Sequence, residues 1–215
     1  RHNEQSLRVV DVLEKDGRGL NLTAATRDGI LRHSKSRAGL TASAAGQPGT
    51  LEGEVVKIAD GVAYINHDLD DALRAGILEP GEIPPVVLEV LGHTHAGRID
   101  RLVVDIVRHS DAGMPPGRIA ISPPVHAAAD ALREFLYERV YTPLNERSDT
   151  ARAQHIVRTL FGHFCDNADR LPREWQGHGR ADPPERLVAD YVASMTDRYA
   201  IDLYEQLFVP QNWAV

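Results

Sequence analysis

The spacing of the apolar residues constrains the fold more than any other feature of this chain. Apolar side chains recur at intervals of three and four, as in Ile99, Leu102 and Ile106, and do not alternate with polar ones. This period is that of a helix with one buried face, whereas a half-buried strand needs a period of two. Even the β-branched residues fall at helical intervals. The sequence therefore predicts an all-α protein.

Caps and helix breakers divide the chain into blocks. Thr23 is suited to cap a helix that ends near His33. Ser122 is a candidate cap before Pro123 in a first turn, and Pro143 is expected to stop that helix. Residues 36–50 are small and Gly-rich, which predicts a surface loop. The predicted helices are residues 2–17, 23–33, 51–75, 84–92, 96–110, 122–143, 149–165 and 184–208.

Composition limits the class of protein. A chain of 215 residues with 42% hydrophobic content can bury a sizeable core as one large domain or two small ones. The net charge of -7 argues against strong DNA binding but leaves room for a local basic pocket. The single cysteine, Cys165, excludes an internal disulfide, is read as a core thiol and fits a reducing compartment. No apolar run approaches the roughly 18 residues of a membrane span, so a cytoplasmic protein without membrane contact is predicted.

One helix carries an unusual polar stripe. In "KIADGVAYINHD", Asp60, Tyr64 and Asp68 recur every four residues within an otherwise apolar run. At about 100° per residue they fall within roughly 80° of one another. His67 and Asp71 lie near the same stripe. A helix that is apolar over most of its circumference is normally buried, so the stripe faces either solvent or an internal site.

The residues alone leave both interpretations open. A charged stripe is most often simply a solvated helix face. Alternatively, carboxylates inside a protein persist where a cation or metal pairs with them, and Asp and His are ligands for Mg, Mn, Fe or Zn. The chain has no Gly-rich phosphate loop, no GxSxG elbow and no CxxC pair that would decide the chemistry.

The order of longer segments indicates a family. "RHNEQSLRVVDVLE", "GLNLTAATRDGILRHS" and "GTLEGEVVKIADGVAYINHDLDDALRAGIL" closely resemble the bacterial deoxyguanosinetriphosphate triphosphohydrolase-like proteins of the HD-domain superfamily. The resemblance continues through "RIDRLVVDIV", "LREFLYERVY", "LFGHFCDNADRLP" and "DYVASMTDRYAIDLYEQLF" and covers essentially the whole chain. It implies an HD-domain-type helical bundle and hydrolysis of a dNTP to deoxynucleoside and tripolyphosphate.

The resemblance also implies roles for single residues. Asp60 matches the last ligand of a divalent metal (Mg, Mn, Fe or Zn). Tyr64 and Asp68 match the wall of the sugar pocket, where the carboxylate accepts a hydrogen bond from the deoxyribose 3′-OH. His2 matches a catalytic histidine near the substrate phosphates. His67 and Asp71 receive no role from the resemblance and are expected only to continue the stripe into solvent.

This chain departs from the family pattern in its metal ligands. The family's first metal His and its His-Asp doublet lie upstream of the segment that matches here, so three of the four ligands are absent. The letters HD in "NHD" belong to the helix of Asp60 and are not that doublet. The chain opens on Arg1 and not on Met, so we expect residues upstream of it to supply the missing ligands.

The resemblance predicts an organisation and alternatives to it. Residues 1–110 would form the C-terminal part of the HD catalytic domain, and residues 111–215 a helical region packed on it as one structural unit. Partners would be the dNTP substrate, further copies in a homo-oligomer such as a hexamer, and a second dNTP as activator. The alternatives are another HD-type nucleotide phosphohydrolase and a catalytically inactive nucleotide-sensing or assembly subunit.

Overall fold

The computed structural model describes residues 1–34, 46–111, 113, 117–145, 148–176 and 182–210. These residues form helices and one isolated antiparallel bridge, between Asp111 and Arg118, and no strand. The predicted all-α class is confirmed and is consistent with an HD-type bundle. Most of the loop predicted at 36–50 lies outside the described residues. No helix in the described ranges has both the length and the apolar character needed to cross a membrane.

The chain divides into two compact units by its backbone contacts. The first comprises Arg1–Val10 and Asn21–Leu144, and the second Asp11–Leu20 and Asn145–Val215. The division predicted between residues 110 and 111 falls inside the first unit, and the expected packing of the two predicted parts as one structure stays a prediction. The helices of the first unit are α1 (His2–Arg8), α3 (Ala24–Arg32), α4 (Leu51–Arg74), α5 (Pro85–Leu91), α6 (His95–His109) and α7 (Pro123–Leu136), with a 3-10 turn at Pro80–Glu82.

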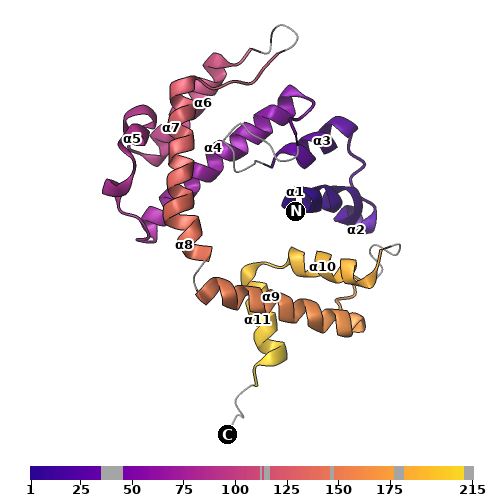
Figure 1. Ribbon diagram of the computed structural model, residues 1–215. Coiled ribbons are helices and arrows are strands. Elements are labelled where there is room, and N and C mark those ends of the chain that lie inside the picture. Colours follow the sequence, from indigo (N-terminus) through magenta and orange to yellow (C-terminus); the bar gives the residue numbers. More distant parts are fainter. Residues whose placement is uncertain (35–45, 112, 114–116, 146–147, 177–181, 211–215) are drawn as a thin grey trace. The chain divides into compact units, whose positions relative to one another are not determined.

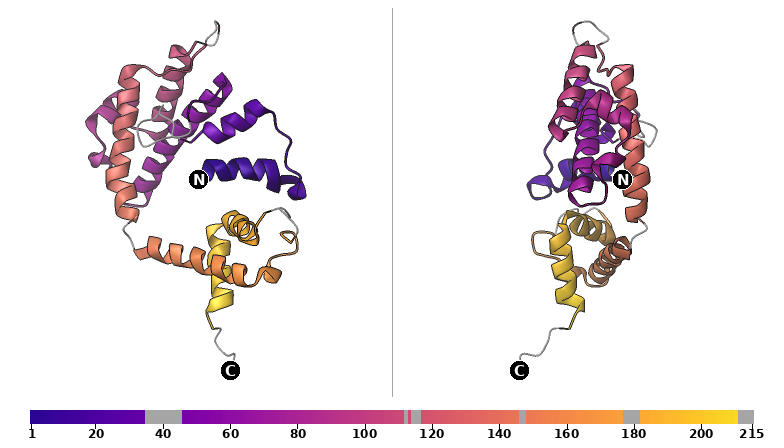
Figure 2. Two further views of the ribbon diagram at one scale, coloured as in Figure 1. Left: turned by 45° about the vertical axis from the view of Figure 1, so that its right-hand side comes forward. Right: turned by 90° about the vertical axis from the view of Figure 1, so that its left-hand side faces the viewer.

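The core of the first unit lies where α4, α5, α6 and α7 meet (Figures 1 and 2). Each helix contributes the apolar face that its spacing of three and four predicts. Fully buried examples are Ile65 and Leu69 from α4, Val87 from α5, Leu102 from α6 and Leu132 from α7. One face of α4 therefore packs in the core, and the opposite face is left for other contacts.

Helices α1 and α3 extend this unit along the first turns of α4. The α3–α4 contact is close because a glycine stands on each side: a Cβ added to Gly29 would lie 3.6 Å from the Cα of Gly53. At Gly53 a Cβ would also come within 2.7 Å of Pro48, so only glycine fits there. Helix α1 packs on α3, and the buried Asn3 donates to the carbonyl of Leu31 at 2.7 Å.

The helix caps agree with the sequence in part. Thr23 accepts a hydrogen bond from the Thr26 amide, as predicted for an N-cap. The predicted stop at Pro143 is wrong. Helix α7 continues through a π-helical turn, Tyr137–Tyr141, into α8 (Thr142–Asn145). Pro143 is the second residue of α8, and a first turn tolerates the missing N–H of proline.

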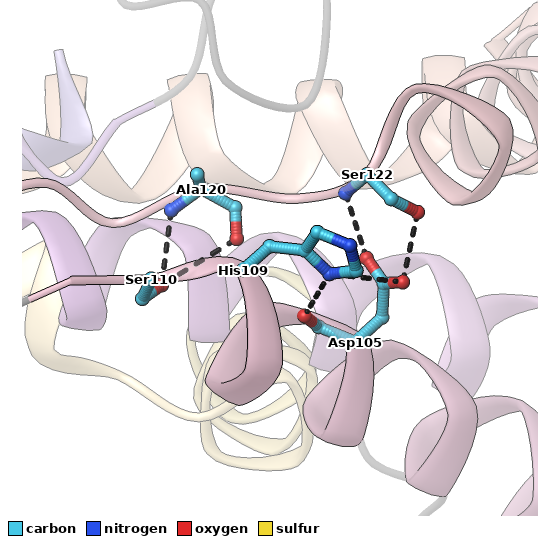
Figure 3. Close-up of polar contacts among 5 residues, drawn as sticks. All are labelled: Asp105, His109, Ser110, Ala120 and Ser122. Carbon is cyan, nitrogen blue, oxygen red and sulfur yellow. Dashed lines mark hydrogen bonds and ion pairs between the residues drawn. The ribbon is translucent and has the colours of Figure 1, made fainter.

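A buried carboxylate fixes the start of α7 (Figure 3). Asp105, on α6 and 6% exposed, accepts hydrogen bonds from the backbone amide of Ser122 at 2.7 Å and from its hydroxyl at 2.8 Å. Ser122 precedes α7 as predicted, but its side chain donates to Asp105 and makes no cap bond. The ring of His109 also lies 3.4 Å from the same carboxylate, and the hydroxyl of Ser110 accepts from the amide of Ala120 at 3.0 Å.

The second unit has its own core. Its helices are α2 (Glu14–Gly17), α9 (Ser148–Asp166), α10 (Pro184–Ser194) and α11 (Asp197–Phe208), with a 3-10 turn at Ala168–Arg170. Leu160 and Phe164 from α9 pack with Leu171 and with Val188 and Tyr191 from α10. Cys165 is half-buried against this core, and burial raises the pKa of its thiol, which agrees with a structural thiol.

Candidate functional site

Helix α4 presents the polar stripe on the side that the core does not use. Asp60, Tyr64 and Asp68 follow one another at single-turn spacing within one helix that runs from Leu51 to Arg74 without a break. The core-facing residues, Ile65 among them, occupy other directions around the same helix. The structure therefore confirms that the three side chains share a face, which the spacing alone had indicated.

The stripe changes from exposed to half-buried along its length. Asp60 is exposed, and Tyr64 is 41% exposed. Asp68 is half-buried because the end of α7 passes over this part of α4. The three side chains thus line the surface of the first unit, with the shelter increasing toward Asp68.

An aromatic cluster from the π-helical turn surrounds the sheltered end. The hydroxyl of Tyr141 donates to Oδ2 of Asp68 at 2.5 Å. The ring of Tyr141 lies 5.7 Å from that of Tyr64 and 5.0 Å, edge to face, from that of Tyr137, as measured between centroids. Such separations are favourable for aromatic pairs. Two segments far apart in the sequence thereby build one wall of phenol rings and a carboxylate.

The electrostatics of this wall keep its phenols neutral. Burial raises the pKa of Tyr141 far above its ordinary value, and the hydrogen bonds to Asp68 and Tyr64 act in the same direction. Burial also raises the pKa of Tyr64, with further contributions from Asp68, Tyr137 and Asp60, while its hydrogen bond with Tyr141 lowers it. At neutral pH both hydroxyls therefore carry protons and can donate hydrogen bonds.

The exposed end of the stripe leads into a groove between α3 and α4. The groove has a volume of about 570 Å³, and its walls include Glu52, Val56 and His33. Glu52 and Val56 precede Asp60 by two turns and one turn on the same face of α4. The ring of His2, exposed at the start of α1, lies 5.3 Å from that of His33, edge to face. The sequence-predicted His2 thus lies beside one residue of the groove wall, His33.

The described residues do not form a metal site by themselves. Asp60 is an exposed carboxylate, and a bound divalent cation needs several protein ligands or substrate oxygens. Over the described ranges, no group of three or more His, Cys, Asp or Glu side chains lies close enough to hold an ion. The ligand role predicted for Asp60 therefore stays a prediction, as do the roles of His2, Tyr64 and Asp68.

Two further polar residues of α4 make separate contacts. Asp71 pairs with Arg74 at the exposed C-terminal end of the helix. The ring of His67 lies 4.9 Å from that of His95. Both residues therefore contact neighbours other than the aromatic cluster, and the expectation that they only continue the stripe into solvent stays a prediction.

Sequence reasoning missed Tyr141 and Tyr137. Both stand in "LREFLYERVY", four residues apart, which would place them on one helix face. The spacing alone does not show which face that is or what it meets. It is the packing of α7 on α4 that turns Tyr141 toward Asp68.

Comparison with known proteins supports the expected kinship. Residues 119–206 match a family described as the phosphohydrolase-associated domain. A deoxyguanosinetriphosphate triphosphohydrolase-like protein of Caldanaerobacter subterraneus subsp. tengcongensis is 44% identical over 213 residues, which cover 99% of this chain and 59% of that protein. Proteins of the same name from Desulfatibacillum aliphaticivorans and Clostridium perfringens strain 13 are 37% and 36% identical, over 97% and 98% of this chain and 62% and 61% of their own lengths.

The chain is a relative of the deoxyguanosinetriphosphate triphosphohydrolase-like proteins. The resemblance inferred from the sequence is confirmed, and the chain spans about six tenths of the length of the relatives that it matches. Relative to the matched phosphohydrolase-associated region, the three stripe residues Asp60, Tyr64 and Asp68 lie before it, whereas Tyr137 and Tyr141 lie within it. The aromatic cluster therefore joins that region to the helix that carries the stripe.

Proposed function

We propose that this protein hydrolyses a deoxynucleoside triphosphate, such as dGTP, to deoxynucleoside and tripolyphosphate in a metal-dependent reaction. The names of its relatives support this substrate and reaction class. The observation that carries the proposal is the wall formed by Asp68, Tyr64 and Tyr141, because it combines a carboxylate with aromatic rings on one accessible face. Such a wall suits a sugar, whose hydroxyl needs an acceptor and whose ring needs a flat surface.

Within this proposal the wall holds the deoxyribose. The described part of the chain gives Asp68 one hydrogen-bond donor, the Tyr141 hydroxyl on Oδ2, so Oδ1 can accept the 3′-OH of the sugar. The exposed ring of Tyr64 lies beside the sugar at C2′, where it leaves little space for a 2′-OH. Holding the sugar in this way orients the α-phosphorus toward the other end of the stripe, which is catalysis by positioning.

The proposed reaction exchanges one bond at the α-phosphorus. The oxygen of a water molecule forms a bond to the α-phosphorus, and the bond from that phosphorus to the 5′-oxygen breaks. The leaving 5′-oxygen takes up a proton, which gives the deoxynucleoside, and the new oxygen remains on the tripolyphosphate. We assign His2 to this proton transfer or to hydrogen bonding with the phosphate oxygens, since an imidazole can serve either role at neutral pH.

Asp60 is proposed as one ligand of a divalent metal, either Mg, Mn, Fe or Zn. The described residues do not complete such a site, so the bond changes above are derived without the ion. The proposal is checked by the metal content of the full-length protein. Asp60→Asn should lower the bound metal by at least half, whereas the matched change Asp71→Asn on the same helix should leave it unchanged.

The reaction is tested by incubating the full-length protein with dGTP and Mg²⁺ or Mn²⁺ in ¹⁸O-labelled water. Phosphorus NMR and mass spectrometry should find deoxyguanosine and tripolyphosphate, with the label in the tripolyphosphate. Release of orthophosphate or pyrophosphate would instead indicate another HD-type nucleotide phosphohydrolase. Binding of dGTP without hydrolysis would support the nucleotide-sensing or assembly alternative, and either result overturns the proposal.

The assembly and its regulation stay predictions. A homo-oligomer, such as a hexamer, would be seen directly by analytical ultracentrifugation of the full-length protein. Activation by a second dNTP would make the initial rate rise more steeply than linearly with dGTP at low concentration. With a net charge of -7, strong DNA binding is not expected.

A further inference from the structure

The hydrogen bond between Tyr141 and Asp68 links the two segments that build the candidate sugar wall. The donor and acceptor are 73 residues apart in the sequence, and the distance between them is 2.5 Å. Tyr141 is half-buried, and so is Asp68. A hydrogen bond to one carboxylate oxygen restricts the rotation of the group, so it also restricts the directions in which the second oxygen can point.

The fold positions Tyr141 firmly. It ends the π-helical turn Tyr137–Tyr141, and π turns within helices are frequent at functional sites. The preceding residues Leu136 and Val140 are buried in the core of the first unit, at 0% and 4% exposure. The core therefore holds this turn in place, and the Tyr137 ring packs edge to face against Tyr141.

The protonation state of Tyr141 agrees with a permanent donor. Burial, Asp68 and Tyr64 all raise its pKa. A phenol with a raised pKa keeps its proton throughout the physiological range. The hydroxyl thus donates to Asp68 at every pH at which a cytosolic enzyme works.

We propose that Tyr141 is a positioning residue of the nucleotide site: its hydroxyl holds Oδ2 of Asp68 so that Oδ1 points at the 3′-OH of the substrate. This inference rests on the proposed function and adds to it a determinant of specificity in the phosphohydrolase-associated region. Tyr141 acts through Asp68 and does not touch the reacting phosphorus. Its consequence is discrimination between a 2′-deoxynucleotide and a 2′,3′-dideoxynucleotide, which lacks the hydroxyl that Oδ1 accepts.

The experiment compares dGTP with ddGTP in the full-length protein and in Tyr141→Phe. We expect the wild type to prefer dGTP and the variant to lose about tenfold of that preference in kcat/KM, because a misdirected acceptor weakens a hydrogen bond to a charged group. The ratio is measured on one preparation, so any loss of folded protein cancels. Tyr191→Phe is the control, since it removes a buried phenol that bonds to Tyr199 at 3.0 Å in the second unit.

A double-mutant cycle separates positioning from a general structural role. In Asp68→Asn the preference for dGTP should already be lost, and adding Tyr141→Phe should change it by less than about twofold. The inference is overturned if Tyr141→Phe keeps the wild-type preference, if Tyr191→Phe lowers it equally, or if the two changes act additively.

Failure of the proposed function is distinguishable from failure of this inference. If the protein hydrolyses neither nucleotide, the proposed reaction is wrong, and the ratio of the dissociation constants of dGTP and ddGTP is then measured by calorimetry. A wild-type preference for dGTP that Tyr141→Phe reduces about tenfold would still support the positioning role. Equal binding of both nucleotides, or binding of neither, would overturn it.

Discussion

Two carboxylates of the first unit, Asp105 and Asp68, meet very different surroundings. Asp105 is buried and receives the amide and hydroxyl of Ser122, with the His109 ring also in reach. Asp68 is half-buried and, in the part of the chain that the structure describes, receives the Tyr141 hydroxyl on one oxygen. Asp105 connects α6 to the residue before α7, and Asp68 connects α4 to the π-helical turn after α7. Of these two, Asp68 is the carboxylate that keeps an oxygen without a donor among the described residues.

The number of donors distinguishes a carboxylate that stabilises the fold from one that can bind a ligand. A buried carboxylate is stable where donors of its own chain satisfy it, and such saturation leaves it nothing to offer a substrate. An oriented carboxylate with one free oxygen beside an open surface has spare hydrogen-bonding capacity. We therefore expect changes at Asp105 to reduce stability, and changes at Asp68 to reduce activity with little effect on stability.

The largest effect is expected from Asp105→Ala. The change leaves the amide and the hydroxyl of Ser122 without their acceptor, and each unsatisfied polar group costs about 1–3 kcal/mol. The free energy of unfolding of the first unit should fall by about 2–4 kcal/mol, as measured by urea unfolding. Asp100→Ala, at an exposed position of the same helix, is the control and should change it by less than about 0.5 kcal/mol. Equal effects of the two changes would show that the Asp105 contacts do not hold α7.

The second-largest effect is expected from Asp68→Asn, and it should be an effect on activity and not on stability. In Asp68→Asn the amide oxygen can still accept from Tyr141, but the NH₂ group then faces the position that we propose for the 3′-OH and cannot accept from it. We expect kcat/KM for dGTP to fall by about 10- to 100-fold, the loss of a hydrogen bond to a charged group. The unfolding free energy should change by less than about 1 kcal/mol. Full activity in this variant would contradict the binding role, and Asp71→Asn serves as the control.

The sequence predicted the helices and one face of the candidate site for a simple reason. The relations that define a helix and its stripe are local, so Asp60, Tyr64 and Asp68 could be placed together from a spacing of four. The caps were partly readable, as Thr23 shows. Their partners on α7 were not readable, because a contact across 73 residues depends on how α7 packs against α4.

The remaining misses have the same physical origin. Ser122 was expected to cap α7, but its hydroxyl donates to a carboxylate 17 residues earlier and makes no cap bond. Pro143 was expected to stop the helix, but the π turn that ends at Tyr141 restarts the helix just before the proline. In both places a tertiary contact or a local change of helix type overrode a rule that considers only neighbours in the sequence.

A smaller effect is expected from the ring beside Asp68. Tyr64→Ala removes the ring that we propose leaves little space for a 2′-OH, so discrimination of dGTP against GTP should fall by about tenfold in kcat/KM, comparable to steric discrimination of a small group. Tyr64→Phe keeps the ring and should keep the discrimination. The ratio is measured by tripolyphosphate release from the two nucleotides. An unchanged ratio in the alanine variant would assign the selectivity to another residue.

The raised pKa of Tyr141 should make the stability of the first unit depend on pH in the alkaline range. The pKa of Tyr141 is raised in the folded protein, so above the ordinary value of about 10 the unfolded chain loses a proton that the folded chain keeps. This contribution is complete below pH 10 and is lost as the pH rises, by about 1.4 kcal/mol per pH unit. Urea unfolding at pH 7, 10 and 11 should show a shallower decline in Tyr141→Phe. Identical slopes would mean that the phenol is not sheltered.

The smallest effect is expected from His109, which lies beside the buried carboxylate of Asp105. The side chain of His109 is 48% exposed, and its Nδ1 is hydrogen-bonded to the backbone carbonyl of Asp105 at 2.8 Å. The same nitrogen lies 3.4 Å from the Asp105 carboxylate, which is a weak, solvent-screened contact. His109→Ala should therefore lower the unfolding free energy by less than about 0.5 kcal/mol, far less than Asp105→Ala, when measured in urea at neutral pH. A loss near that of Asp105→Ala would mean that the imidazole, and not Ser122, satisfies the buried carboxylate. The ranking of these two changes therefore decides whether Ser122 or His109 satisfies the buried carboxylate of Asp105. Asp68 differs because, among the described residues, the Tyr141 hydroxyl occupies one of its oxygens and the other can still accept a hydrogen bond.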